Sequence, residues 1–171
     1  MNTIHYQYYE TPFGELILGS FEGKLCLCDW RYRKARRVID SRLQNGLKAS
    51  MKEQACPVLA KTKHQLDEYF NRKRKTFELP LLTVGTDFQK SVWQALVHVP
   101  FGNTSTYLQL AKTIKNKSAI RAVANANGAN ALSIIIPCHR IIGSNGKMVG
   151  YAGGLPTKEK LLTLENDLFA A

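Results

Sequence analysis

The chain has 171 residues and carries 24 Lys and Arg against 13 Asp and Glu, a formal net charge of +11. That size and a 44% hydrophobic content are typical of a soluble protein with one or two domains, and the basic balance points to an anionic partner, nucleic acid first. Residues 1–10 do not resemble a signal peptide and no apolar run could span a membrane, so we expect a cytoplasmic chain with four reduced cysteines.

The first third of the chain predicts β-structure. Ile4, Tyr6 and Tyr8 alternate with polar residues, and the turn sequences TPFG and EGK then separate two further strands, ELILGSF and KLCLCDW. Cys26 and Cys28 lie on the same face of the third strand, but no further ligands follow at a suitable spacing. We therefore expect neither a metal site nor a cofactor.

Two helices and a linker complete this half. The segment RYRKARRVIDSRL predicts a helix with Val38, Ile39 and Leu43 as its apolar stripe, and we interpret its cations as a solvated face. The segment KTKHQLDEYFNRKRK predicts a second helix, and TFELPLLTVG is typical of a linker. We expect a structural α/β domain over 1–85 and a second domain over 86–171.

The second half predicts short helices. Thr86 and Gln89 form a capping-box pattern that opens a helix with these residues inside: Phe88, Val92, Leu96 and Val97. A short helix from about Thr106, a turn and another short helix capped by Ser118 resemble a helix-turn-helix.

The second of these short helices, AIRAVANAN, has few long polar side chains. We expect Ile120, Val123 and Ala124 to face inward and Arg121 to face elsewhere, and no charged residue occurs from Ala122 up to residue 139. A helix that reads the major groove normally carries several long polar side chains. Small residues instead favour close approach in the minor groove, with the single arginine either entering the base stack or widening the groove.

The stretch SIIIPCHRIIG places Cys138 beside His139 after three isoleucines, which predict a buried strand ended by Pro137. A thiol in this position is either an inert buried residue or a nucleophile that needs a base. Neighbours in an extended chain point to opposite faces, so we expect a water molecule between the thiol and the imidazole.

The last predicted helix starts near Thr157, and its apolar stripe is Leu161, Leu164 and Leu168. Glu165 lies at the edge of this stripe, where a carboxylate is costly to bury without a partner. It could orient His139 in a Glu165–His139–water–Cys138 relay, or it could be a solvated carboxylate near the helix end.

The segment 143–154 has five glycines but lacks the GxxxxGK[ST] spacing of a nucleotide-phosphate loop. It therefore either shapes a pocket for a flat ligand or is a plain surface loop.

These motifs together resemble the methylated-DNA–protein-cysteine methyltransferases, also called 6-O-alkylguanine-DNA alkyltransferases. The resemblance rests on PCHR at 137–140, GYAGG at 150–154 and Glu165, and on TDFQKSVWQALVHVPFGNTSTYLQLA and IRAVANANGAN upstream. It is close over 86–167 and looser before, and it indicates the bacterial single-polypeptide form without the regulatory zinc module. It implies an α+β fold with a small ribonuclease H-like α/β domain followed by a mainly helical, winged helix-turn-helix-like domain.

The resemblance also implies roles for individual residues. Cys138 would be the alkyl acceptor, His139 the base acting through water, Glu165 its orienting carboxylate, Asn130 a brace for the active-site turn, and Tyr107 the proton donor to the base. The implied DNA contacts are Arg121, which replaces the flipped base, with Ala122, Tyr107 and Ser118. The implied substrate pocket consists of Tyr151, Ala152, Gly153, Val149, Pro137 and Met148.

The implied activity is a single, irreversible transfer of the alkyl group from 6-O-alkylguanine, and from 4-O-alkylthymine, to Cys138. The protein would act as a monomer on the minor groove of duplex DNA. Three residues depart from the family pattern without removing a functional group: Ala124, Ala131 and Ala152. Two alternatives remain at this stage: a thiol hydrolase, and a binding-only protein of the alkyltransferase-like or helix-turn-helix regulator kind.

Overall fold

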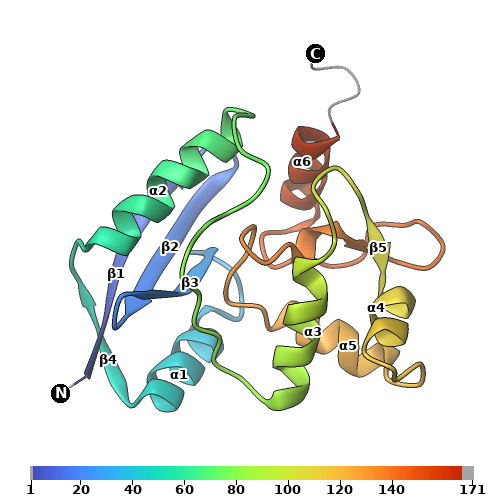
Figure 1. Ribbon diagram of the computed structural model, residues 1–171, viewed down its shortest axis with the longest axis horizontal. Helices are drawn as coiled ribbons and strands as arrows, with labels where there is room; N and C mark the ends of the chain where they lie inside the picture. Colours follow the sequence, from blue (N-terminus) through green and yellow to red (C-terminus); the bar gives the residue numbers. More distant parts are fainter. Residues whose placement is uncertain (1, 167–171) are drawn as a thin grey trace. The chain divides into compact units, whose positions relative to one another are not determined.

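The computed structural model describes residues 2–166 (Figure 1). Its contacts divide the chain into two compact units, Met1–Gly85 and Thr86–Ala171. The first combines a sheet with helices and the second is mainly helical, so the predicted α+β class is confirmed. Within 2–166, no helix has both the length and the apolar character needed to cross a bilayer.

The first unit is built on a four-stranded sheet in the order β3-β2-β1-β4. Strands β1 (Asn2–Thr11), β2 (Gly14–Phe21) and β3 (Lys24–Trp30) form an antiparallel meander. Strand β4 (Ala49–Glu53) pairs with β1 in parallel. The three predicted strands are confirmed. Strand β4 was not predicted, because this short edge strand has no buried residue and its sequence, ASMKE, therefore lacks an alternating apolar pattern.

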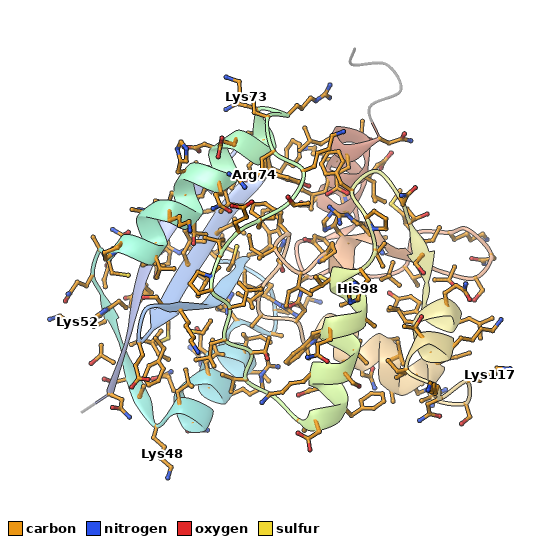
Figure 2. All side chains as sticks on the ribbon, in the orientation of Figure 1. Lys48, Lys52, Lys73, Arg74, His98 and Lys117 are labelled. Atoms are coloured by element: carbon orange, nitrogen blue, oxygen red, sulfur yellow. The ribbon has the colours of Figure 1, made fainter. Side chains whose placement is uncertain are left out.

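Two helices belong to this unit, α1 (Arg36–Leu47) and α2 (Pro57–Phe70), and α2 packs on β1 and β2. In α1 Ile39 and Leu43 are buried as predicted, but Val38 is 69% exposed, so its place in the stripe was wrong. Neighbours on a helix are about 100° apart, and the i, i+4 pair leaves Val38 on the solvent side. Basic side chains project widely from the unit, as at Lys48, Lys52 and Lys73 (Figure 2).

The second unit contains α3 (Asp87–Val97), α4 (Tyr107–Thr113), α5 (Ile120–Gly128), a one-turn 3₁₀ helix η1 (Cys138–Arg140) and α6 (Leu155–Glu165). Strands β5 (Ser105–Thr106) and β6 (Ile141–Ile142) pair in parallel. The capping box of Thr86 and Gln89 is present at α3, which confirms that prediction. Val97 is 52% exposed and was wrongly placed inside.

The start of α5 differs from the prediction. The helix begins at Ile120 with Ala119 as its N-cap, while the Ser118 hydroxyl donates to the Asn116 side-chain oxygen at 3.1 Å. Ser118 therefore does not cap the helix. Val123 is fully buried as expected, but Ile120 is 40% exposed, because it opens the first turn where the helix is not yet covered.

The isoleucines before the PCHR motif form a buried turn and not the predicted strand. Ile134 has a φ of +71°, and the Ile135 and Ile136 amides donate to the Ser133 and Leu132 carbonyls at 2.8 Å. These local bonds satisfy the backbone without a neighbouring strand. Burial was predicted correctly, since none of the three is more than 8% exposed, but β-branched composition did not decide the backbone.

Candidate active site

Cys138 is the first residue of η1 and is 3% exposed. Its amide donates to the Ile136 carbonyl at 2.8 Å, and the Arg140 amide donates to the Pro137 carbonyl at 3.0 Å. The thiol is therefore fixed by a tight turn that follows a buried one. Because the chain is coiled here, the opposite-face argument for Cys138 and His139, which assumed an extended chain, does not apply.

Asn130 braces the segment that leads into this turn. Its side-chain amide donates to the Ile136 carbonyl at 2.9 Å, and its side-chain oxygen accepts from the Leu132 amide at 2.9 Å. One buried side chain thus ties together both ends of the Leu132–Ile136 turn, where a helix or strand would use its own backbone bonds.

Glu165 is the penultimate described residue and is only 3% exposed. Its carboxylate oxygens lie 2.7 Å from His139 Nε2 and 2.7 Å from Arg140 Nε, and Arg140 Nη2 donates a further bond at 3.0 Å. Burial alone would raise the pKa of Glu165, but the bonds and charges of His139 and Arg140 outweigh it and hold the pKa at about 2. The carboxylate is thus permanently ionised near neutral pH.

His139 is fully buried. Burial lowers its pKa, and the Arg140 and Lys158 charges lower it further, while Glu165 opposes both effects. A neutral imidazole beside a carboxylate carries its proton on the nitrogen that faces the carboxylate, here Nε2. The other nitrogen, Nδ1, is buried and has no hydrogen-bond partner within residues 2–166, so its lone pair can accept a proton.

Arg140 is a functional residue that the sequence reading left without a role. Besides its bonds to Glu165, its Nη1 donates to the Val99 carbonyl at 2.7 Å, beyond the end of α3. It joins α6, η1 and the segment after α3 around one carboxylate. A buried carboxylate whose other partner is a neutral histidine needs a cation to balance its charge. Arg140, next to His139 in the sequence, could have been identified as that cation.

Tyr107 begins α4, whose N-cap hydroxyl is that of Thr106. Its own hydroxyl donates to the Val149 carbonyl at 3.4 Å. Burial and the negative charge of the Cys138 thiolate raise the pKa of Tyr107, and a hydrogen bond from the Asn127 side chain lowers it. The phenol and the thiol are therefore close enough to interact electrostatically.

Lys158 is the least expected residue of the site, because its side chain is completely buried in α6. Its ammonium donates to the carbonyls of Ile141, Val149 (3.0 Å) and Gly150 (3.2 Å). It ties Ile141, just before the glycine-rich segment, to Val149 and Gly150 in the middle of that segment. Burial lowers the pKa of Lys158, and the Cys138 thiolate opposes this effect. Lys158 lies three residues before Leu161 and so falls on the apolar stripe of the helix, and this spacing could have indicated that it is buried.

The remaining predicted residues lie around this centre or on α5. The Tyr151 ring stands edge-on to His139 with 6.4 Å between centroids. Pro137 is buried, Ala152 and Gly153 are half-buried, and Met148 and Val149 are 38% and 48% exposed. On the helix-turn-helix, Ser118, Arg121 and Ala122 are exposed. Helix α6 starts at Leu155, two residues earlier than expected, and Leu168 lies outside the described residues.

Comparison with known proteins assigns this architecture to a family. Residues 4–83 match the ribonuclease-like domain of 6-O-methylguanine DNA methyltransferase, and residues 87–167 match its DNA binding domain. The chain is similar to the methylated-DNA–protein-cysteine methyltransferase of Methanosarcina acetivorans, with 42% identity over 95% of this chain and 98% of that protein. The constitutive enzyme of Bacillus subtilis is 40% identical over 94% of both chains.

A solved structure of Mycobacterium tuberculosis OGT in complex with DNA has a similar fold. It superposes with a TM-score of 0.81 at 34% identity, covering 95% of this chain and 92% of that one. These matches extend over both units and confirm the family that the sequence motifs indicated. The chain therefore belongs to the 6-O-methylguanine DNA methyltransferase family.

Proposed function

We propose that this protein repairs DNA by transferring the alkyl group of 6-O-alkylguanine, and of 4-O-alkylthymine, to its own Cys138. The observation that carries the proposal is the buried Cys138–His139–Glu165 arrangement in a chain of this family. The transfer forms a thioether and occurs once per molecule, because the new carbon–sulfur bond is stable to hydrolysis.

The thiolate forms when His139 Nδ1 takes the thiol proton through one water molecule. Glu165 accepts from Nε2 at 2.7 Å and stabilises the imidazolium that results. The positive charge of Lys158 lies close enough to interact with the thiolate and favours it further. The thiolate then attacks the alkyl carbon in line with the carbon–oxygen bond.

As that bond breaks, its electron pair passes to the guanine oxygen and ring. Tyr107 donates its proton to the base, which otherwise leaves as a costly anion. Backbone donors of the segment Gly150–Gly154, Ala152 in particular, face the developing charge on the oxygen. The three bonds of Lys158 support this role because they fix the start of that segment.

For DNA we propose that α5 enters the minor groove of the duplex and that the damaged base is flipped into the pocket. The exposed Arg121 takes the place of the extruded base, and the small Ala122 permits close approach. The protein acts as a monomer, in the cytoplasm. The relative solved in complex with DNA supports a DNA partner.

A thiol hydrolase remains the alternative with the same residue types. The two functions differ in stoichiometry. We expect duplex DNA containing 6-O-methylguanine to add one methyl group to the Cys138 peptide, measured by mass spectrometry, and the reaction to stop at one equivalent. Cys138→Ala should keep its affinity for DNA and transfer nothing. Repeated turnover on DNA, or on an ester without DNA, would refute the proposal.

A further inference from the structure

Helix α5 is held in its unit by one buried face. Val123 is fully buried and Ala126 is 3% exposed, and Trp93 Nε1 of α3 donates to the Ala126 carbonyl at 2.9 Å. The helix packs against both α3 and α4 (Figure 1). These contacts fix the rotation of α5 about its own axis, so the face that it turns to solvent is also fixed.

The exposed face of α5 consists of small residues and two polar ones. Of the residues of α5, all of which the structure describes, only Arg121 and Asn125 are exposed and have polar side-chain atoms. Ala122 and Gly128 are exposed beside them. Residues three and four apart lie on the same side of a helix, so Asn125 lies one turn beyond Arg121 and Ala122.

The side chain of Asn125 has no partner in the fold. Its backbone carbonyl accepts from the Ala129 amide at 3.0 Å, but its side chain makes no hydrogen bond to any residue within 2–166. Asparagine is also less favourable than alanine inside a helix. Neither a contact nor helix propensity therefore accounts for an asparagine here, and both its donor and its acceptor are available to a ligand.

The proposed function places this face in the minor groove of duplex DNA. There A·T and G·C pairs both present acceptors, but only G·C adds a donor, the 2-amino group of guanine. The amide of Asn125 can donate to an acceptor of any base pair, and its oxygen can accept from the guanine amino group alone. Along the helix axis Asn125 lies about 6 Å from Arg121, or about two base-pair steps.

We propose that Asn125 is a specificity-determining residue that contacts base edges in the minor groove and favours transfer where G·C pairs flank the lesion within about two base pairs. This inference rests on the proposed function, in which α5 enters the minor groove and Arg121 replaces the extruded base. Ala122 and Gly128 support it, because small residues let the helix approach closely enough for a short side chain to reach the base edges.

The test measures the second-order rate of methyl transfer from three duplexes that differ only in the pairs flanking 6-O-methylguanine: G·C, A·T or inosine·cytosine. Inosine lacks the 2-amino group but keeps the major-groove edge of guanine. Differences in duplex stability affect every variant alike, so the rate ratios of the unchanged protein are compared with those of Asn125→Ala. We expect the unchanged protein to favour the G·C duplex over the other two by about 5-fold more than Asn125→Ala does, the effect of one hydrogen bond.

Two further variants serve as controls. Asn45→Ala, the same change at an exposed asparagine near the end of α1, should keep the preference for G·C. Arg121→Ala should slow transfer from all three duplexes about equally, since the arginine acts at the vacated position and not at the neighbouring pairs.

The outcomes that contradict the inference are distinct. Unchanged rate ratios in Asn125→Ala, whether its rates fall together or not at all, would overturn it, because a phosphate contact or the deformability of the DNA would then account for the data. A preference that the inosine duplex retains would also overturn it, since the guanine amino group would not be what is read. Failure of the proposed function itself would appear as no transfer by the unchanged protein from any duplex.

Discussion

Each unit of this protein buries one carboxylate between two basic side chains, and the partners differ. In the first unit Asp29, with no exposed surface, is held by Arg33 and Arg36, each at 3.0 Å. In the second, Glu165 is held by Arg140 and His139, each at 2.7 Å. Two arginines only neutralise a carboxylate, because neither can release its proton. Replacing one arginine by a histidine converts the same arrangement into a proton acceptor.

The buried thiols divide in the same way. Burial raises the pKa of Cys26 to about 12 and that of Cys28 further still, so both stay protonated. Cys138 is as buried, at 3% exposed, but it has Lys158 within electrostatic reach and a histidine next to it in the chain. Burial therefore makes a thiol inert only where no cation or base accompanies it.

The largest expected effect concerns these thiols. Cys138→Ala should abolish methyl transfer from DNA, whereas Cys28→Ala should leave the transfer rate unchanged and lower only the stability of the first unit. The measurement is the methylated fraction of the protein after incubation with excess methylated duplex. If Cys28→Ala lost transfer while it was folded to the same extent as the unchanged protein, Cys28 would not be the inert thiol described above.

The second prediction concerns the two carboxylates. Glu165→Gln should slow transfer by about 100-fold or more, because the imidazolium loses its stabilising charge. Asp29→Asn should instead cost about 3–5 kcal/mol of unfolding free energy by removing the buried carboxylate that Arg33 and Arg36 share, although Arg36 keeps its bond to Asp40. Single-turnover kinetics and denaturant unfolding of both variants test this prediction. Equal transfer rates in the two variants would show that the two carboxylates do not differ in function.

Sequence alone predicted what local pattern decides. The capping box of Thr86 and the three strands of the meander follow from spacing along one element, whereas the same spacing left Glu165 open between a partner of His139 and a solvated carboxylate. The prediction of a strand at Ile134 was wrong, because the turn there depends on a hydrogen bond from the side chain of Asn130. The β-propensity of the isoleucines takes no account of such a partner. Sequence alone also missed Lys158, since a lysine is normally solvated and only three converging carbonyls make its burial possible.

The third prediction uses acid to test the second unit. The pKa of Glu165 is about 2, below its ordinary value of 4.5, so its contribution to stability is present above that value and is lost as the pH falls toward 2. The lowered pKa of His139 acts in the same direction, since the buried ring resists charging. Between pH 5 and pH 2 the unfolding free energy of the unchanged protein should therefore fall by about 2 kcal/mol more than that of Glu165→Gln. An unchanged slope would show that the carboxylate does not govern acid stability.

The smallest expected effect belongs to Lys158, which has two roles that separate by substitution. Lys158→Met removes both the charge near the thiolate and the bonds to Ile141, Val149 and Gly150, so transfer should slow about 10-fold and fall more steeply as the pH decreases. Lys158→Arg keeps the charge and should restore the pH dependence while the altered shape leaves the rate low. Lys160→Met, on an exposed side chain of the same helix, is the control. If Lys158→Met slows transfer equally at every pH, the lysine only holds the glycine-rich segment, and the reactivity of the buried thiol rests on His139 alone.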